Sequence, residues 1–437
     1  MKNKILSLAL LSASFLSANV LLPSQAYQLA LENSNKIKSS SLQLDSKKED
    51  LNQLNSKYYP QIDLTLDYND TDFEYNELHN RTDFHVTEKS LDYIVSLRQS
   101  LYNHETNTKV DLESKRVKLQ EIELKRQKQQ LSKEIFEAYL IALNSKNKIK
   151  LLKSYLEYNE EKLTAITKRY EMNISSKMDL LETTVEVNRS KIDLLKEQKL
   201  LKTYLLKLEQ FTNMTNITLP NINFEKFDIS SLINKKDLDK NEKSFLTNNL
   251  EYIQSNETVQ LSNLELLNAK SSHYPKLDFD ARYTRYESDA VTSDYENSMR
   301  FSVKLQIPLY SGGYVSSRIK SSKIKQQASR EDLEVVKDNL ILQNNELLSL
   351  LNTSISTVDL YKEALVSANS YMGFIEQGYS NGLKSSIDLF EAKNKVFEIK
   401  YEYIKNIQEF IGIYVDYLIL NNDIEKLKQI DYIIKKG

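Results

Sequence analysis

Four segments of the chain alternate between apolar and polar residues, which is the pattern of β-strands. They span about 61–74, 90–102, 276–287 and 297–309. Their apolar positions are spaced two residues apart: Ile62, Leu64, Leu66, Tyr68, Leu91, Tyr93, Val95, Leu97, Leu277, Phe279, Ala281, Tyr283, Met299, Phe301, Val303, Leu305 and Ile307. Each strand therefore has one apolar face and one polar or charged face. Strands of this length are typical of membrane β-barrels, and the alternation alone fits a soluble sandwich equally well.

The number of strands decides between these two structures. A sandwich needs a second sheet to cover its apolar face, and the sequence shows no further strand pattern. A membrane barrel needs about eight or more strands, so one chain with four cannot close it. Three chains would supply about twelve strands. We therefore expect a mixed α/β membrane protein that is complete only as a trimer.

A different spacing, seven residues, predicts long helices at about 104–171, 179–212, 314–379 and 388–420. The apolar heptad positions are Ile135, Ala142, Ile149, Leu156, Leu163, Tyr170, Leu180, Val187, Leu194, Leu201, Leu208, Leu351, Val358, Leu365, Met372, Tyr379, Leu389, Val396, Tyr403, Phe410 and Tyr417. Turns at 173–178 and 382–387 interrupt the pattern, which predicts two antiparallel coiled-coil pairs. The longer helices would reach roughly 100 Å.

The chain is internally duplicated. Segments 56–68, 93–102 and 170–182 match segments 271–283, 301–310 and 379–391 in the same order, about 210 residues later. The match divides the chain into a first repeat at 19–220, a polar linker at 221–243, a second repeat at 244–420 and a tail at 421–437. In each repeat a helix precedes two strands, a long helix, a turn and a return helix.

Composition excludes several classes of protein. The 437 residues include 61 Asp and Glu against 59 Lys and Arg, a balance that argues against a nucleic-acid-binding protein. The absence of Cys excludes disulfides, cysteine-ligated zinc and a lipid on an N-terminal cysteine. The four His show no metal-ligand spacing, and no catalytic motif is found. We therefore predict no enzyme activity, no cofactor and no metal site.

The first 18 residues have the features of a secretory signal peptide. Lys2 and Lys4 precede an apolar run from Ile5 to Leu11, and small residues lead to Ala18. Cleavage after Ala18 is preferred to cleavage after Ala26, because Ala26 then belongs to the first helix of the mature chain.

In the order and doubling of its elements, the chain resembles the TolC-like outer-membrane efflux and secretion channels. The motifs that carry the resemblance are Tyr-Pro at Pro60 and Pro275, Leu-Tyr-Ser-Gly-Gly ending at Gly313, and Gly378-Tyr379-x-x-Gly382 followed by Asp388-Leu-Phe-Glu391. The resemblance implies a trimeric β-barrel of twelve strands in the outer membrane, continued by a tunnel of twelve coiled-coil helices across the periplasm. The linker and the tail would form a small mixed belt around the tunnel.

The resemblance also implies a pore constriction. Asp388 and Glu391 match the positions that ring the periplasmic mouth in this family. A ring of six carboxylates from three copies would prefer cations, and repulsion within the ring would raise the pKa values of these carboxylates. The alternative is that acidic residues in the first turn of a helix only complement its dipole. We keep that interpretation for Asp179 and Glu182.

Further residues at the helix turns receive roles from the same resemblance. Tyr379 and Lys384 would hold the closed mouth by polar bonds to a neighbouring turn, with Asp179 as the acceptor. Lys384 replaces a common arginine, which weakens such a latch because lysine cannot form a bidentate bond. The positions expected to dock the adaptor are Tyr170, Asn173, Gly378 and Gly382. Asn173 stands where the second repeat has Gly382, and Asn can adopt the same left-handed conformation.

The function that follows is an outer-membrane exit duct of a tripartite efflux or type I secretion system. Its partners would be two further copies of the chain, outer-membrane lipid, a periplasmic adaptor and an inner-membrane pump of the RND or ABC type. Two alternatives stay open: export of proteins or peptides instead of drugs, and a pore-less trimeric stalk or adhesin.

Overall fold

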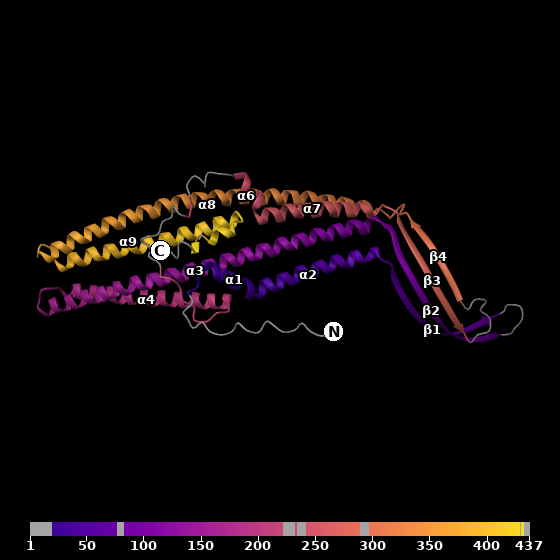
Figure 1. Cartoon of the computed structure of the whole chain (residues 1–437), viewed down its shortest axis with the longest axis horizontal. Coiled ribbons are helices and arrows are strands. Elements are labelled where there is room, and N and C mark those ends of the chain that lie inside the picture. The colour runs from indigo at the N-terminus through magenta and orange to yellow at the C-terminus, as the bar shows by residue number, and fades with distance from the viewer. Residues whose placement is uncertain are drawn as a thin grey trace, which may run out of the picture. The chain divides into compact units, whose positions relative to one another are not determined.

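The computed structural model describes most of the chain after the expected signal peptide (Figure 1). The described residues are 20–76, 83–221, 232–233, 242–288, 297–428 and 430–431. The signal peptide at 1–18 and most of the linker at 221–243 lie outside them. The chain forms two compact units, each made of separate stretches of sequence.

One unit comprises Ser39–Leu124 and Glu251–Val336 and carries the sheet. Its strands are β1 (Gln61–Asn76), β2 (Asp83–Asn103), β3 (Lys276–Ser288) and β4 (Asn297–Gln306). They pair antiparallel in the order β1-β2-β3-β4. The unit also holds most of α2 (Asn35–Asn55) and α7 (Leu250–Ser271), and the first parts of α3 (His104–Glu171) and α8 (Tyr314–Ser380).

Several strand boundaries differ from the alternation pattern. We expected strands at 61–74 and 90–102, but β1 continues to Asn76 and β2 begins at Asp83. The ladder continues past the regularly alternating segment, from Asn69 opposite Ser90 to Asn76 opposite Asp83, because backbone hydrogen bonds do not require alternating apolar side chains. In contrast, β4 ends at Gln306 and not at 309. Pro308 follows closely and has no N–H to continue the ladder.

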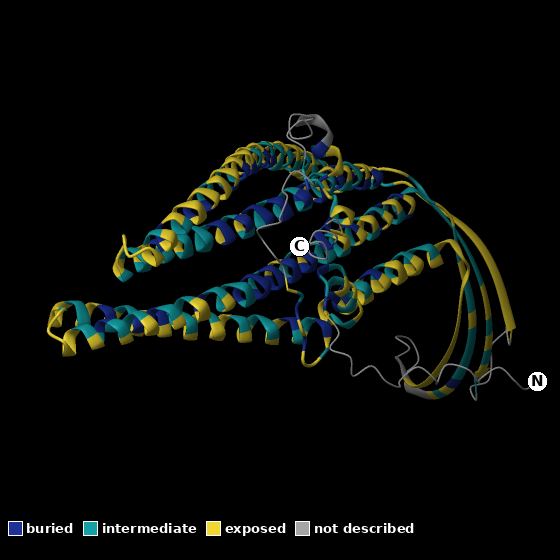
Figure 2. Ribbon diagram, turned by 60° about the vertical axis from the view of Figure 1, so that its left-hand side comes forward, coloured by how far each residue is buried: buried dark blue, intermediate teal, exposed yellow. Residues whose placement is uncertain are grey.

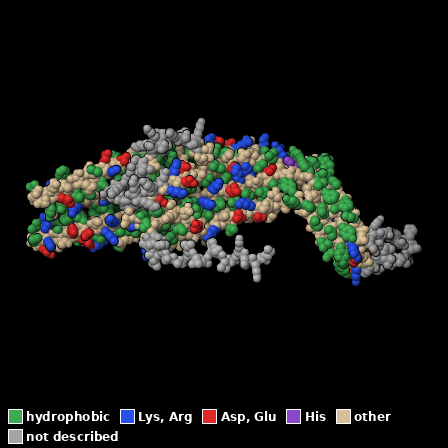
Figure 3. All heavy atoms as spheres, viewed as in Figure 1, with side chains coloured by type: hydrophobic (Ala, Val, Ile, Leu, Met, Phe, Trp, Pro, Cys, Tyr) green, Lys and Arg blue, Asp and Glu red, His purple; other side chains and the backbone are tan. Residues whose placement is uncertain are grey.

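The sheet has one continuous apolar face. The register places Ile62, Leu97, Ala281 and Phe301 in one row across the four strands. On the two outer strands every apolar side chain of this face is more than half exposed: Ile62, Leu64, Leu66, Tyr68, Met299, Phe301, Val303 and Leu305. Figure 2 shows exposed residues along these strands, and Figure 3 shows hydrophobic side chains gathered over the sheet. An apolar surface of this extent indicates contact with lipid or with another protein surface.

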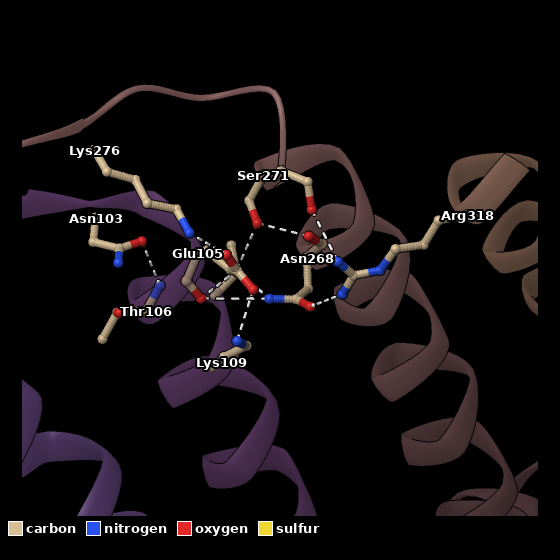
Figure 4. A network of polar contacts seen from close by, with 10 residues as sticks. Asn103, Glu105, Thr106, Lys109, Asn268, Ser271, Lys276 and Arg318 are labelled. Atoms are coloured by element: carbon tan, nitrogen blue, oxygen red, sulfur yellow. Dashed lines mark hydrogen bonds and ion pairs between the residues drawn. The ribbon is translucent and has the colours of Figure 1, made fainter. Parts of the chain in front are cut away.

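A polar network lies where the sheet joins the helices (Figure 4). The carboxylate of Glu105, in the first turn of α3, forms ion pairs with Nζ of Lys109 at 2.7 Å and with Nζ of Lys276 at 2.8 Å. These two hydrogen-bonded ammonium groups lower the pKa of Glu105 to about 2. Asn268 of α7 donates to Oγ1 of Thr108 at 2.8 Å and accepts from Arg318 of α8 at 2.9 Å. The network therefore ties β3, α3, α7 and α8 together.

The other unit contains the turns of the long helices. It holds α1 (Pro23–Asn33), α4 (Lys177–Thr212), α6 (Glu242–Asn248), α9 (Ser386–Leu420), η4 (Ile424–Lys426) and the remaining parts of α3 and α8. The heptad positions that are buried in this unit are Ile135, Ala142, Val187, Leu208, Leu351, Val358, Leu365, Tyr403 and Phe410. Tyr170 and Tyr379, the heptad residues next to the turns, are exposed. Of the helices described, none combines the length and the apolar character that crossing a bilayer requires.

Short segments near both ends of the chain pack on the helices of this unit. The hydroxyl of Tyr139 donates to the carbonyl of Leu21 at 2.7 Å, and Leu21 N–H donates to the carbonyl of Thr218 at 3.0 Å. Asp431 accepts the backbone N–H of Ser24 at 3.1 Å. Cleavage after Ala26 would remove these N-terminal contacts; cleavage after Ala18 stays a prediction.

Candidate functional site

The two helix turns, which we call the tips, have the same backbone structure. In the first tip Asn173 has a φ of 59°, and in the second Gly382 has a φ of 71°. The carbonyl of Arg169 accepts the N–H of Ile174 at 2.8 Å, and the carbonyl of Gly378 accepts the N–H of Leu383 at the same distance. Asn173 thus adopts the left-handed conformation predicted from its match to Gly382, and each tip ends its helix with the bonds of a Schellman-type cap.

Gly378 leaves room for a side chain of the turn. A Cβ atom at this position would lie 2.7 Å from Cγ of Lys384, which is closer than carbon atoms approach one another. The aliphatic part of Lys384 therefore lies against Gly378. The first tip has Arg169 at the matching position.

Both return helices begin with a capping box. Ser385 N–H and the Ser385 hydroxyl donate to Oδ2 of Asp388 at 2.8 Å each, and Asp388 N–H donates back to Oγ of Ser385 at 3.1 Å. These bonds, with a smaller contribution from Lys384, hold the pKa of Asp388 below its ordinary value. In the single chain Asp388 is therefore a helix-capping carboxylate with a lowered pKa. Ser176 and Asp179 form the same box in the first tip, and the pKa of Asp179 is lowered for the same reason.

Glu391 takes no part in this cap. It lies three residues after Asp388, on the same side of α9, and its side chain is exposed. Asp388 and Glu391 thus present two carboxylates on one face immediately after the tip. The arrangement can attract cations, but one chain supplies only a segment of any ring.

The expected latch residues are not in contact within one chain. Tyr379 is 46% exposed. Among the residues that the structure describes, no hydrogen bond or ion pair joins Tyr379 or Lys384 to Asp179, whose carboxylate accepts the N–H of Ser176 at 2.9 Å. A latch between these groups therefore requires a tip of another copy of the chain, or another conformation of the same chain.

Instead, contacts between α3 and α9 connect the two helical pairs. The rings of Tyr155 and Phe397 stack with centroids 3.9 Å apart. Tyr158 packs against Phe390 at 5.0 Å, and Nζ of Lys393 lies 5.6 Å above the Tyr158 ring. We call this contact the α3–α9 seam; its remaining members, farther from the tips, are Lys148 with Tyr401, Asn144 with Gln408, Lys133 with Asp416 and Gln129 with the carbonyl of Ile419.

The heptad analysis did not find the seam, because heptads identify the partners within each helical pair. Within the first pair, Asn159 donates to Oγ of Ser190 at 2.8 Å and Lys162 bonds Glu186 at 2.9 Å. A sequence signal for the seam exists in the aromatic spacing of α9, where Phe390, Phe397 and Tyr401 share one face.

Comparison with known proteins agrees with this architecture. The sequence matches the outer membrane efflux protein family over residues 26–214 and 249–407. Outer membrane protein TolC of Escherichia coli strain K12 is 24% identical over 432 residues, which cover 92% of this chain and 85% of TolC. The proteases secretion protein PrtF of Dickeya chrysanthemi is 19% identical over 423 residues, covering 92% of this chain and 90% of PrtF.

Solved structures show the same fold. The outer membrane channel CmeC of Campylobacter jejuni superposes with a TM-score of 0.77 at 14% identity, covering 91% of this chain and 85% of CmeC. The family match extends through both repeats and includes both tips. The chain therefore belongs to the outer membrane efflux protein family and is an outer-membrane protein.

Proposed function

We propose that three copies of this chain form the exit duct of a tripartite efflux or type I secretion system. The duct would passively conduct cargo from an inner-membrane pump, of the RND or ABC type, and its periplasmic adaptor across the periplasm and the outer membrane. The family match supports an outer-membrane efflux or secretion channel. It therefore disfavours the pore-less stalk or adhesin.

The observation that carries the proposal is the incomplete sheet. β1 and β4 are its two edge strands, and the described side chains along both are exposed. An open edge in a bilayer leaves backbone groups without hydrogen bonds, so membrane-spanning sheets close on themselves. Three copies joined edge to edge would close a barrel of about twelve strands.

The long helices support the same assembly. In one chain α4 and α8 each leave a series of apolar side chains exposed to solvent. These are Leu181, Val185, Ile192, Leu195 and Leu206 on α4, and Leu342, Leu350, Leu360, Val366 and Phe374 on α8. Covering such surface contributes about 25 cal/mol per Å². Helices of neighbouring copies would cover it in a tunnel, with the described parts of the linker and tail as its belt.

The tips would form the periplasmic mouth. Asp388 and Glu391 from each copy would surround the constriction and make it cation-selective. Tyr379 and Lys384 would close the mouth by bonds to a neighbouring turn, with Asp179 as acceptor. The outer surfaces of the tips, at Tyr170, Asn173, Gly378 and Gly382, would receive the adaptor.

Planar-bilayer recordings test the channel and its mouth. We expect the purified protein to conduct with cation preference, and Asp388→Asn with Glu391→Gln to reduce that preference. The matched control is Glu182→Gln, which neutralises the carboxylate of the first tip that corresponds to Glu391, lies outside the proposed latch and should leave selectivity unchanged. Electrically silent protein, wild type and variants alike, would refute the duct; equal effects of Glu391→Gln and Glu182→Gln would refute the constriction.

A second recording tests the latch. Replacing Tyr379 by Phe and Lys384 by Ala should raise single-channel conductance, because the closed mouth loses its polar contacts. Conductance equal to that of the wild type would rule the latch out.

The cargo has two candidates. Drugs or other small molecules are one, and proteins or peptides are the other, which the similarity to a proteases secretion protein supports. Deleting the gene separates the two candidates. Increased drug susceptibility alone would identify small molecules as the cargo, and loss of proteins from the culture medium alone would identify proteins or peptides.

A further inference from the structure

The two open edges of the sheet carry opposite charge. On the polar face of β1 the charged residues between Gln61 and Asn69 are Asp63 and Asp67, and on the polar face of β4 they are Arg300 and Lys304. All four side chains are exposed. Within the described part of the chain, none of them makes a hydrogen bond or an ion pair. In each pair the two residues are four positions apart.

Two of these charges also have a like charge beside them within the chain. The register places Asp67 directly opposite Asp92 of β2, and Arg300 directly opposite Arg282 of β3. Like charges directly opposite one another destabilise a sheet. One carboxylate oxygen of Asp92, Oδ1, is moreover buried without a hydrogen-bond partner. Both edges therefore leave an electrostatic repulsion that the single chain does not relieve.

We infer that β1 pairs with β4 of a second copy in the register that places Asp63 opposite Lys304 and Asp67 opposite Arg300. Neighbouring strands alternate in direction, so β1 meets the next copy's β4 antiparallel. The register creates one charged row across the junction, from Arg282 and Arg300 of one copy to Asp67 and Asp92 of the next. This inference rests on the proposed trimer and specifies how its copies meet.

The apolar residues restrict the register independently. The same pairing places Ile62, Leu64, Leu66 and Tyr68 opposite Leu305, Val303, Phe301 and Met299 of the second copy, which keeps the apolar face continuous. A shift by one residue would turn every side chain to the wrong face. A shift by two keeps the faces but puts Asp63 opposite Gln306 or Ser302, and both ion pairs are lost. Among registers that keep the faces, only the inferred one forms both ion pairs.

The sheet already contains an ion pair of this kind. Arg98 of β2 lies directly opposite Asp280 of β3, with Nε 3.3 Å from the carboxylate oxygen Oδ1. Directly opposed, oppositely charged residues can thus pair on this face of the sheet.

Disulfide crosslinking tests the register, because the chain has no native Cys. The inferred pair is Asp63→Cys with Lys304→Cys, and the matched controls combine Asp63→Cys with Ser302→Cys or with Gln306→Cys. Directly opposed Cβ atoms are about 5 Å apart and diagonal ones about 7–8 Å, so the opposed pair should crosslink several-fold more. Opposed residues in antiparallel strands alternate between hydrogen-bonded and non-hydrogen-bonded pairs, whose Cβ distances differ. The neighbouring pair, Leu64→Cys with Val303→Cys, is therefore tested in parallel. Its controls combine Leu64→Cys with Phe301→Cys or with Leu305→Cys.

Each outcome has a distinct meaning. Covalent dimers and trimers formed mainly by the 63/304 or 64/303 pair support the inference. Preferential crosslinking of a control pair overturns the register and leaves the trimer standing. If no pair crosslinks, the size of the detergent-extracted particle separates the remaining cases: a trimer overturns the β1–β4 pairing alone, and a monomer overturns the proposed duct as well.

Discussion

The polar network at the base of the sheet predicts a pH-dependent loss of stability when Glu105 is replaced by Gln. The substitution keeps the shape of the side chain and removes its charge. Glu105 is 17% exposed and has two lysine partners, Lys109 on the same helix and Lys276 at the start of β3. The variant leaves both ammonium groups without their carboxylate.

The size of the effect follows from the pKa. Each pKa unit corresponds to about 1.4 kcal/mol, so a fall from 4.5 to about 2 would correspond to about 3 kcal/mol of native-state stability. The lysine side chains are 42% and 35% exposed, and water screens the interaction on that side. We therefore expect Glu105→Gln to lower the free energy of unfolding by about 1–2 kcal/mol at pH 7.

The sign of the pH dependence is fixed by the lowered pKa. The native state favours the ionised form of Glu105, so its stabilisation is complete above the ordinary pKa of 4.5 and is lost as the pH falls toward about 2. The difference between wild type and variant should therefore shrink from pH 5 to pH 2, as Glu105 becomes protonated in the wild type.

Urea unfolding of the detergent-solubilised protein at low ionic strength, followed by circular dichroism at a series of pH values, measures this difference, because urea does not screen the ion pairs. The control is Glu121→Gln, because Glu121 is exposed on the same helix and has no partner among the described residues. It should cost less than about 0.5 kcal/mol at any pH. A Glu105→Gln penalty that is independent of pH, or no larger than that of the control, would contradict the ion-pair argument.

Three further sets of substitutions test the tips and the seam by the same unfolding assay. Asn173→Gly should change stability by less than about 0.5 kcal/mol, whereas Asn173→Ala and Gly382→Ala should each destabilise by about 1 kcal/mol. The reason is that only Gly and Asn tolerate the left-handed backbone at these positions. Equal effects of Gly and Ala at position 173 would refute this explanation. Gly378→Ala should cost about 1 kcal/mol and be rescued by Lys384→Ala, which removes the clashing side chain; an unrescued loss would place the clash elsewhere. A double-mutant cycle of Tyr155→Ala and Phe397→Ala should give a coupling of about 0.5–1.5 kcal/mol, and additive effects would show that the stacked rings contribute nothing as a pair.

The sequence alone determined the local structure. Period-two alternation indicated all four strands, because on a pleated strand successive side chains point to opposite faces. Heptad spacing indicated the long helices, and duplication aligned the two tips closely enough to predict the left-handed Asn173 from Gly382. Each of these inferences depends on residues close together in the chain or on a direct match between the repeats.

Only the tertiary structure decided which distant segments meet. The extension of β1 to Asn76 and of β2 to Asp83 depends on backbone pairing, which continues where the period-two alternation has stopped. The seam between Tyr155 and Phe397 and the ion pair of Glu105 with Lys276 join residues far apart in sequence, so no local spacing encodes them. The opposite charges of β1 and β4 were likewise visible in the sequence, but they became a complementary pair of edges only once the sheet order was known.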